Sequence, residues 1–158
     1  MIFVTLGSQK FQFNRLLEAI DQFIAEGKIT ETVFAQTGYS DYIPQNYEYK
    51  QFLNRDEFSE MQSKADLVIT HGGTGAIVGA LKKEKKVIAV PRLAKFGEHV
   101  DDHQFQIIGQ FKDLNLICAC DKCSSLPEAI DYAKKHTFNI YKSNTNIIIE
   151  SIESFINK

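Results

Sequence analysis

The chain has 158 residues, of which 44% are hydrophobic and 24% are charged, and its formal net charge is -2. This length suits one domain with a substantial core, and the composition is that of a globular protein rather than a disordered, fibrous or membrane-spanning one. The small net charge excludes the broad basic surface that general nucleic-acid binding requires, and no run approaches the ~20 apolar residues of a transmembrane helix.

Apolar runs alternate with amphipathic segments along the chain, which predicts βαβ units in a single domain over residues 1–158. The first run has no basic leader, so it predicts a strand at 2–6 and not a secretory signal. In chain order, we expect a helix at 13–24, strands at 31–36 and 47–52, a helix at 56–64, a strand at 65–70, a helix at 76–83, a strand at 86–90, a helix at 102–112, a strand at 116–119, and helices from 125 or 126 to 135 and at 145–156. The predicted fold is α/β, with six parallel strands and helices on both faces.

Three cysteines, Cys118, Cys120 and Cys123, form a C-x-C-x-x-C run. A closed zinc site needs four ligands, so a histidine such as His136 would have to join them. We interpret the run instead as reduced cysteines at a strand end and the following turn, and we predict no metal site.

The segment after the predicted strand 65–70 is the most informative part of the chain. It reads His71-Gly72-Gly73-Thr74-Gly75 and leads directly into a helix. Backbone N–H groups and the positive end of a helix converge at such a turn, so it favours binding of a diphosphate. Thr74 can cap the helix and donate its hydroxyl to phosphate. The alternative is a tight turn without a ligand; neither the P-loop pattern nor G-x-G-x-x-G is present, which argues against an ATPase or a dehydrogenase.

A second polar segment, residues 91–104, follows the next predicted strand, and its loop should meet the glycine turn at the carboxyl edge of the sheet. Arg92 and Lys95 can face phosphate, and Gln104 can hydrogen-bond phosphate or sugar hydroxyls. Three carboxylates of this segment can accept from hydroxyls: Glu98, Asp101 and Asp102. The alternative is a helix capped by Asp101 or Asp102.

A third loop, Gly7-Ser8-Gln9, follows the first strand at the same edge. Its N–H groups and the Ser8 hydroxyl can contribute to the site, or the loop can simply turn the chain. The convergence of three polar loops is the main evidence for a binding site. His99 and His103 are spaced i, i+4, but no glutamate follows His99 as H-E-x-x-H requires, and no nucleophile elbow is present.

Four segments together resemble the glycosyltransferase family 28 carboxyl-terminal domain, over nearly the whole chain. They are residues 3–8 (Phe-Val-Thr-Leu-Gly-Ser), 36–40 (Gln-Thr-Gly-Tyr-Ser), 69–77 (Ile-Thr-His-Gly-Gly-Thr-Gly-Ala-Ile) and 90–104, which includes Phe96-Gly97-Glu98-His99-Val100-Asp101-Asp102-His103-Gln104. Within the family, the sequence resembles the small single-domain Alg13-like group and bacterial capsule or exopolysaccharide glycosyltransferase subunits.

This resemblance implies a Rossmann-like domain equivalent to the C-terminal half of a GT-B glycosyltransferase, binding a UDP-sugar without an obligatory metal. The site residues would be Gly7, Ser8, His71, Gly72, Gly73, Thr74, Gly75, Arg92, Glu98, Asp101, Asp102 and Gln104. The resemblance also implies an Alg14-like membrane-anchored partner, which binds the lipid-linked glycan acceptor and supplies the catalytic base. We therefore expect a cytoplasmic protein that the partner recruits to the cytoplasmic face of the membrane.

One position departs from the family pattern. Relatives carry a glutamate that holds the ribose hydroxyls in the helix after the glycine turn, and the matching residue here is Gly79. Glycine cannot accept those hydrogen bonds, so another residue must do so, and Glu98 is a candidate.

The leading hypothesis is a UDP-sugar-binding subunit of a two-component inverting hexosyltransferase in surface polysaccharide or lipid-linked glycan synthesis. Two alternatives stay open: a noncatalytic enhancer that activates a separate membrane-bound glycosyltransferase, and a nucleotide-binding regulator. The apolar helix predicted at 145–156 can dock a partner or pack on its own sheet.

Overall fold

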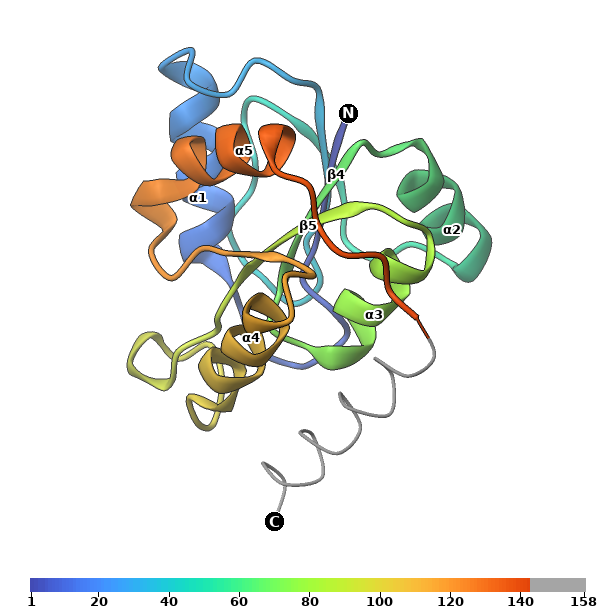
Figure 1. The fold of residues 1–158 in the computed structure, drawn as a ribbon. Coiled ribbons are helices and arrows are strands. Elements are labelled where there is room, and N and C mark those ends of the chain that lie inside the picture. The colour runs from blue at the N-terminus through green and yellow to red at the C-terminus, as the bar shows by residue number, and fades with distance from the viewer. Residues whose placement is uncertain (143–158) are drawn as a thin grey trace.

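A six-stranded parallel sheet forms the centre of the structure, a computed structural model that describes residues 1–142 (Figure 1). The helix predicted at 145–156 lies outside the described residues. The strands are β1 (Ile2–Thr5), β2 (Val33–Gln36), β3 (Glu48–Lys50), β4 (Leu67–His71), β5 (Lys86–Val90) and β6 (Cys118–Ala119). Their order in the sheet is β3-β2-β1-β4-β5-β6, and every pairing is parallel. The predicted fold class is confirmed.

Within residues 1–142, five α-helices and two short 3₁₀ helices lie between the strands or follow the last one. They are α1 (Asn14–Ala25), α2 (Arg55–Lys64), α3 (Thr74–Lys82), η1 (Ala94–Phe96), α4 (His103–Asp113), η2 (Cys123–Ser125) and α5 (Leu126–Lys135). Figure 1 shows α1 and α5 on one side of the sheet and α2 and α3 on the other. The helices therefore cover both faces, as the alternation of apolar and amphipathic segments predicts.

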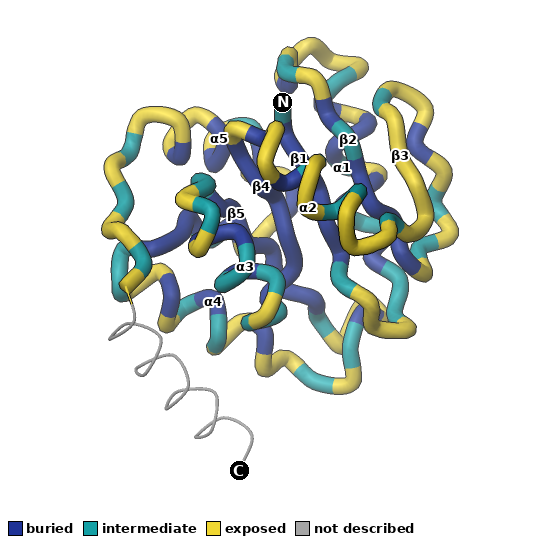
Figure 2. Tube along the Cα trace, turned by 90° about the vertical axis from the view of Figure 1, so that its right-hand side faces the viewer, coloured by how far each residue is buried: buried dark blue, intermediate teal, exposed yellow. Residues whose placement is uncertain are grey.

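The core has two halves because successive side chains of a strand point to opposite faces of the sheet. Ile2 and Val4 of β1 pack with the apolar sides of α1 and α5, whereas Phe3 packs with residues of α3 and α4. The central strands are buried and β3 is exposed at the sheet edge (Figure 2). Strands β1, β4 and β5 are almost continuously apolar because helices cover both faces of the sheet there, so that side chains on both faces are buried.

Two differences from the predicted element ends matter for the site, and both fall at the glycine turn. Strand β4 continues through His71, which pairs in register with Val90, although we expected the strand to end at Thr70. Helix α3 begins at Thr74 with Gly73 as its N-cap, two residues before the predicted start at Ala76. The turn between strand and helix is therefore only Gly72 and Gly73.

The strand order reverses between β1 and β4, and the general rule for open α/β sheets predicts a crevice at that point. From β1 the chain adds β2 and β3 on one side, and it then returns to the other side of β1 with β4. In open α/β sheets, ligands bind outside the carboxyl ends of the strands where the strand order reverses in this way. The loops after β1 and β4, which contain Gly7 and Gly72, flank this point.

The cysteine run lies on β6 and in the turn that follows it. Cys118, Cys120 and Cys123 are free and buried, and His136 instead contacts Asn115 and the ring of Tyr132. Burial raises the pKa of the Cys120 thiol to about 12, which disfavours the thiolate that binds metals. Within residues 1–142, no group of three His, Cys, Asp or Glu side chains is arranged to hold a metal ion. In the same part of the chain, every helix is too short or too polar to span a bilayer.

Candidate functional site

The first turn of α3 presents unused hydrogen-bond donors at the β1–β4 crevice. In the described part of the chain, no hydrogen bond uses the backbone amides of Thr74, Gly75 or Ala76. The first amides of a helix have no intrahelical acceptor, and they lie at the positive end of its dipole. This arrangement can bind a phosphate group.

The amides of Gly72 and Gly73 do not belong to this donor set, which corrects the expectation that they hold the diphosphate directly. The amide of Gly72 donates to Gln104 Oε1 at 3.0 Å, and that of Gly73 donates to His71 Nδ1 at 3.1 Å. Thr74 also differs from expectation, because Gly73 is the N-cap and no side chain caps the helix. The free donors therefore begin at Thr74.

The positions of the turn are glycine for different physical reasons. A Cβ on Gly73 would lie 2.2 Å from His71 Cε1, and one on Gly72 would lie 2.7 Å from Gln104 Cβ. These two residues are glycine because neighbouring side chains fill the space. Gly75 is exposed and has nothing within 4 Å of a Cβ position, so a ligand can approach it closely.

Gln104 lies inside the protein and not on the site surface. It is 4% exposed, its Oε1 accepts from the amides of Gly72 and Arg92, and its Nε2 lies 3.2 Å from His71 Nδ1. Its polar atoms are therefore occupied, in contrast to the predicted contact with phosphate or sugar. Burial, together with the charge of Arg92, lowers the pKa of His71 to about 3, so this ring is neutral near pH 7.

Arg92 and Glu98 also point inward, which corrects their predicted contacts with the ligand. Arg92 is 1% exposed and donates to the carbonyl oxygens of Leu6, Phe11, Gln12 and Glu98. Burial lowers the pKa of Arg92 to about 10, although nearby Glu98 acts in the opposite direction. The guanidinium thus remains charged at neutral pH and holds the loop between β1 and α1 against the loop after β5.

Glu98 is fully buried, and both of its oxygens are occupied. Arg15 donates to them through Nε and Nη2 at 3.0 Å each, and the Leu93 amide donates to Oε1 at 3.0 Å. A carboxylate in this position cannot accept from ribose hydroxyls without losing its ion pair. Glu98 is therefore a structural residue, and the proposed replacement for the family glutamate fails on this geometry.

Asp101 and Asp102 order the segment that enters α4. Asp102 is the N-cap, but its carboxylate accepts from the Ala94 amide at 2.9 Å and does not cap the helix. Asp101 accepts from the His103 amide at 3.0 Å and lies 3.2 Å from His99 Nδ1. The backbone hydrogen bond from His103 is the main cause that lowers the pKa of Asp101. Lys95 is exposed on the same loop.

The loop after β1 lies beside the end of β4. Gly7 has a φ of +73°, which strongly favours glycine, and a Cβ there would lie 2.5 Å from His71 Nε2. Ser8 is exposed beside it. Among the predicted site residues, Ser8, Gly75 and Asp102 are exposed, whereas Arg92, Glu98 and Gln104 are buried.

Sequence reasoning missed two features of this edge. Arg15 is the ion-pair partner of Glu98, but no pattern in α1 distinguishes it from an ordinary surface arginine. Tyr39 and Phe52 follow β2 and β3, are 44% and 41% exposed, and meet edge-to-face with ring centroids 5.2 Å apart. Their position directly after two strands was a usable signal for flat surfaces on which a base can stack.

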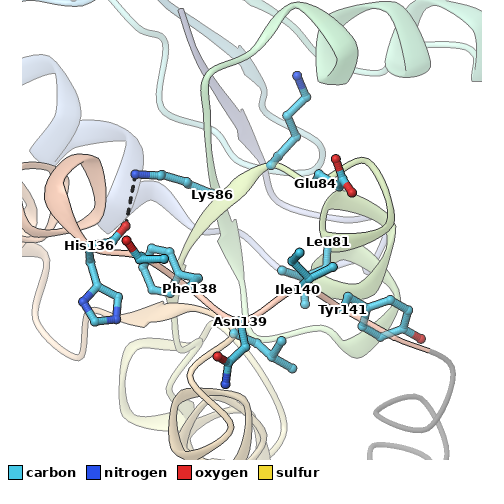
Figure 3. Close-up of a pocket in the computed structure, with 11 residues that line it drawn as sticks. Leu81, Glu84, Lys86, His136, Phe138, Asn139, Ile140 and Tyr141 are labelled. Carbon is cyan, nitrogen blue, oxygen red and sulfur yellow. Dashed lines mark hydrogen bonds between the residues drawn. The ribbon is translucent and has the colours of Figure 1, made fainter.

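A separate pocket of about 320 Å³ lies at the opposite edge of the sheet (Figure 3). Its lining includes Glu84 and Lys86, at the start of β5, and the segment 136–141. Lys86 Nζ donates to the carbonyl oxygens of Lys134 and His136 there. Because ligands of doubly wound sheets bind at the carboxyl ends of strands, we do not place the functional site in this pocket.

The sequence matches the family described as "Glycosyltransferase family 28 C-terminal domain" over residues 1–158. No curated protein matches the sequence. Among solved structures, the chain is similar to the calicheamicin glycosyltransferase CalG4 (TM-score 0.64, 19% identity), covering 98% of this chain and 37% of that one. It is similar to ALG13 (TM-score 0.61, 18% identity), covering 99% and 96%, and to MurG of Acinetobacter baumannii (TM-score 0.55, 18% identity), covering 96% and 49%. The chain thus spans less than half of CalG4 and MurG, and at these identities the likeness concerns the fold.

Proposed function

This chain belongs to the glycosyltransferase family 28 C-terminal domain family, and on that premise we propose that it is the UDP-sugar-binding subunit of a two-component inverting hexosyltransferase. The reaction would serve surface polysaccharide or lipid-linked glycan synthesis. The observation that carries the proposal is the set of unused amides at Thr74, Gly75 and Ala76, which lies where the strand order reverses.

The diphosphate of the donor would bind at the start of α3. Three amides would donate to its oxygens, the Ser8 hydroxyl would approach from the loop after β1, and Nε2 of His71 would approach from the end of β4. During transfer, an acceptor hydroxyl attacks the anomeric carbon and the bond from that carbon to the diphosphate oxygen breaks. The helix end then stabilises the charge on departing UDP, so no metal is required for this role.

The nucleoside would lie towards β2 and β3, where Tyr39 and Phe52 expose their rings. A planar base can stack on such a surface. Gly79 has no side chain to meet the ribose, and the atom nearest to where its Cβ would lie is Gln62 Nε2, at 4.0 Å. Ribose recognition would therefore rely on backbone groups or on groups from another chain.

The acceptor site and the catalytic base would come from an Alg14-like membrane-anchored partner. The proposal of a partner is supported by how much of each similar structure the chain covers. It covers nearly all of ALG13, but only 37–39% of three transferases: CalG4, the kitacinnamycin glycosyltransferase and SnogD. A domain equivalent to one half of a two-domain enzyme needs its other half to close the cleft. The partner would hold the lipid-linked glycan acceptor and recruit this chain from the cytoplasm to the cytoplasmic face of the membrane.

Calorimetric titration of the full chain with UDP tests the donor site. We expect heat of binding with UDP in the presence of a metal chelator, and weaker binding with GDP and ADP of the same charge. The absence of binding at about 1 mM UDP, the weak end of specific affinity, contradicts the proposal if addition of the membrane-anchored partner does not restore it.

A further inference from the structure

The orientation of the Gln104 side-chain amide is determined by its neighbours. Two backbone N–H groups, those of Gly72 and Arg92, point at one of its terminal atoms from 3.0 and 3.1 Å. Backbone N–H groups only donate, so this atom must be the amide oxygen. The other terminal atom is therefore the nitrogen, and it faces His71 Nδ1 at 3.2 Å.

The same reasoning determines the tautomer of His71. The Gly73 amide donates to His71 Nδ1 at 3.1 Å, and the Gln104 nitrogen can only donate to it as well. A ring nitrogen that accepts hydrogen bonds carries no proton, so the proton of the neutral ring is on Nε2. The tautomer thus follows from two donors on one side of the ring.

The Nε2 side of the ring is open. Within residues 1–142, Nε2 has no hydrogen-bond partner, and it is not among the side-chain atoms that are both buried and unpartnered. Gly7 faces it, and only the missing side chain at that position leaves the space free, because a Cβ would lie 2.5 Å from Nε2. An N–H group there points towards the crevice between β1 and β4.

The charged and titratable groups that act on this ring are cationic or can become so. They are Arg92 and His99, which both lie on the connection between β5 and α4. Both disfavour a second proton on His71, as does burial, while the hydrogen bond with Gln104 has the opposite effect. The ring therefore stays neutral over the range in which an ordinary histidine changes charge.

We propose that Gln104 is a positioning residue that fixes His71 as the neutral tautomer protonated on Nε2, and that this N–H donates to an anionic oxygen of the diphosphate. The identity of the ligand rests on the proposed function, whereas the tautomer does not. Because the protonation state of His71 does not change between weakly acidic and weakly basic pH, the ring can donate this hydrogen bond to phosphate throughout that range.

Two-bond 1H–15N correlation spectra of the histidine-labelled full chain test the assignment directly. Between about pH 5 and 8, we expect the His71 signals of a ring protonated on Nε2, without a change of charge. His103, whose side chain is 46% exposed, provides the internal reference. A wild-type ring protonated on Nδ1, or on both nitrogens below pH 7, overturns the proposal.

The Gln104→Glu substitution keeps the shape of the side chain but replaces the donor near Nδ1 with a carboxylate oxygen. We expect His71 to carry a proton on Nδ1 and to change charge within the same pH range. Gln106→Glu is the matched control, because it adds the same charge to an exposed position of α4. If Gln104→Glu does not fold, Gln104→Met removes the donor without adding charge and is expected to raise the population protonated on Nδ1. Spectra of these variants that match those of the control or the wild type overturn the role of Gln104.

Titration with UDP tests the second half of the proposal. At pH 8, where the spectra are expected to show a neutral His71 ring protonated on Nδ1, we expect Gln104→Glu to weaken UDP binding about tenfold or more relative to Gln106→Glu, because Nε2 becomes an acceptor facing phosphate. Equal affinities in the two variants overturn the donor role of His71. If the wild type does not bind UDP at all, the proposed function fails, and the spectra still decide whether Gln104 sets the tautomer.

Discussion

Replacement of Gly75 by aspartate separates ligand binding from folding more cleanly than any other change in the glycine turn. Gly75 is exposed in the first turn of α3, and a Cβ there meets nothing within 4 Å. A carboxylate at the positive end of a helix is favourable by about 0.3–1 kcal/mol, and aspartate has a higher helix propensity than glycine. We therefore expect the free energy of unfolding of Gly75→Asp to equal or exceed that of the wild type.

The same carboxylate repels a bound diphosphate. Two unit charges about 4 Å apart interact with about 1 kcal/mol in water and about 4 kcal/mol near a protein surface. Because Gly75 is exposed, screening favours the lower part of this range, and we expect UDP affinity to fall roughly tenfold to a hundredfold. Gly73→Asp is a poor substitute, because its Cβ would lie 2.2 Å from His71 and would disturb the turn itself.

Calorimetry with UDP and urea denaturation of the same samples measure the two effects. Gly75→Asn has nearly the same shape without the charge and is the matched control. If Gly75→Asp and Gly75→Asn bind UDP equally well, the diphosphate does not lie at the start of α3 and the reasoning is wrong. In a transferase assay with the partner, a full rate despite lost UDP binding would favour the noncatalytic enhancer.

Three further predictions concern stability and are measured by urea denaturation. Gly79→Ala should raise the free energy of unfolding by about 0.5–1 kcal/mol, because alanine is the better helix residue and the nearest atom is 4.0 Å from its Cβ; a loss of stability would show that the space is not free. Glu98→Gln should lower it by about 3 kcal/mol, because it leaves the partly buried Arg15 without its ion-pair partner; a change below about 1 kcal/mol would mean that the pair is dispensable. The pKa of His71 is lowered in the folded protein, so the unfolded chain binds a proton first and stability should fall as pH decreases from about 6.5 towards 3, by up to ~1.4 kcal/mol per pH unit. The His71→Asn variant should lose this part of the slope, and an unchanged slope would contradict the burial of a neutral ring.

The sequence alone was sufficient to predict the helices and strands, because these depend on local residue patterns. The apolar run Lys86–Val90 is a strand with the predicted bounds, and each of the other predicted elements within residues 1–142 occurs within about two residues of its expected ends. Apolar periodicity and glycine turns are properties of a few neighbouring residues, so they can be recognised without knowledge of the tertiary structure. The same holds for the convergence of polar loops at one sheet edge, because parallel strands place all their carboxyl ends together.

The directions of the polar side chains at that edge depend on the tertiary structure. Arg92, Glu98 and Gln104 have the chemistry of ligand-binding residues, and nothing in the sequence distinguishes a guanidinium that faces phosphate from one that holds four backbone carbonyls. Two of their partners are distant in the chain: Arg15 lies 83 residues from Glu98, and Gly72 lies 32 residues from Gln104. By itself, the sequence determined the order of the strands and helices and the edge at which the loops meet, because these follow from local pattern and parallel topology. Only the tertiary structure decided which donors at that edge remain free, because each polar group is satisfied by whichever distant group the fold brings within hydrogen-bonding distance.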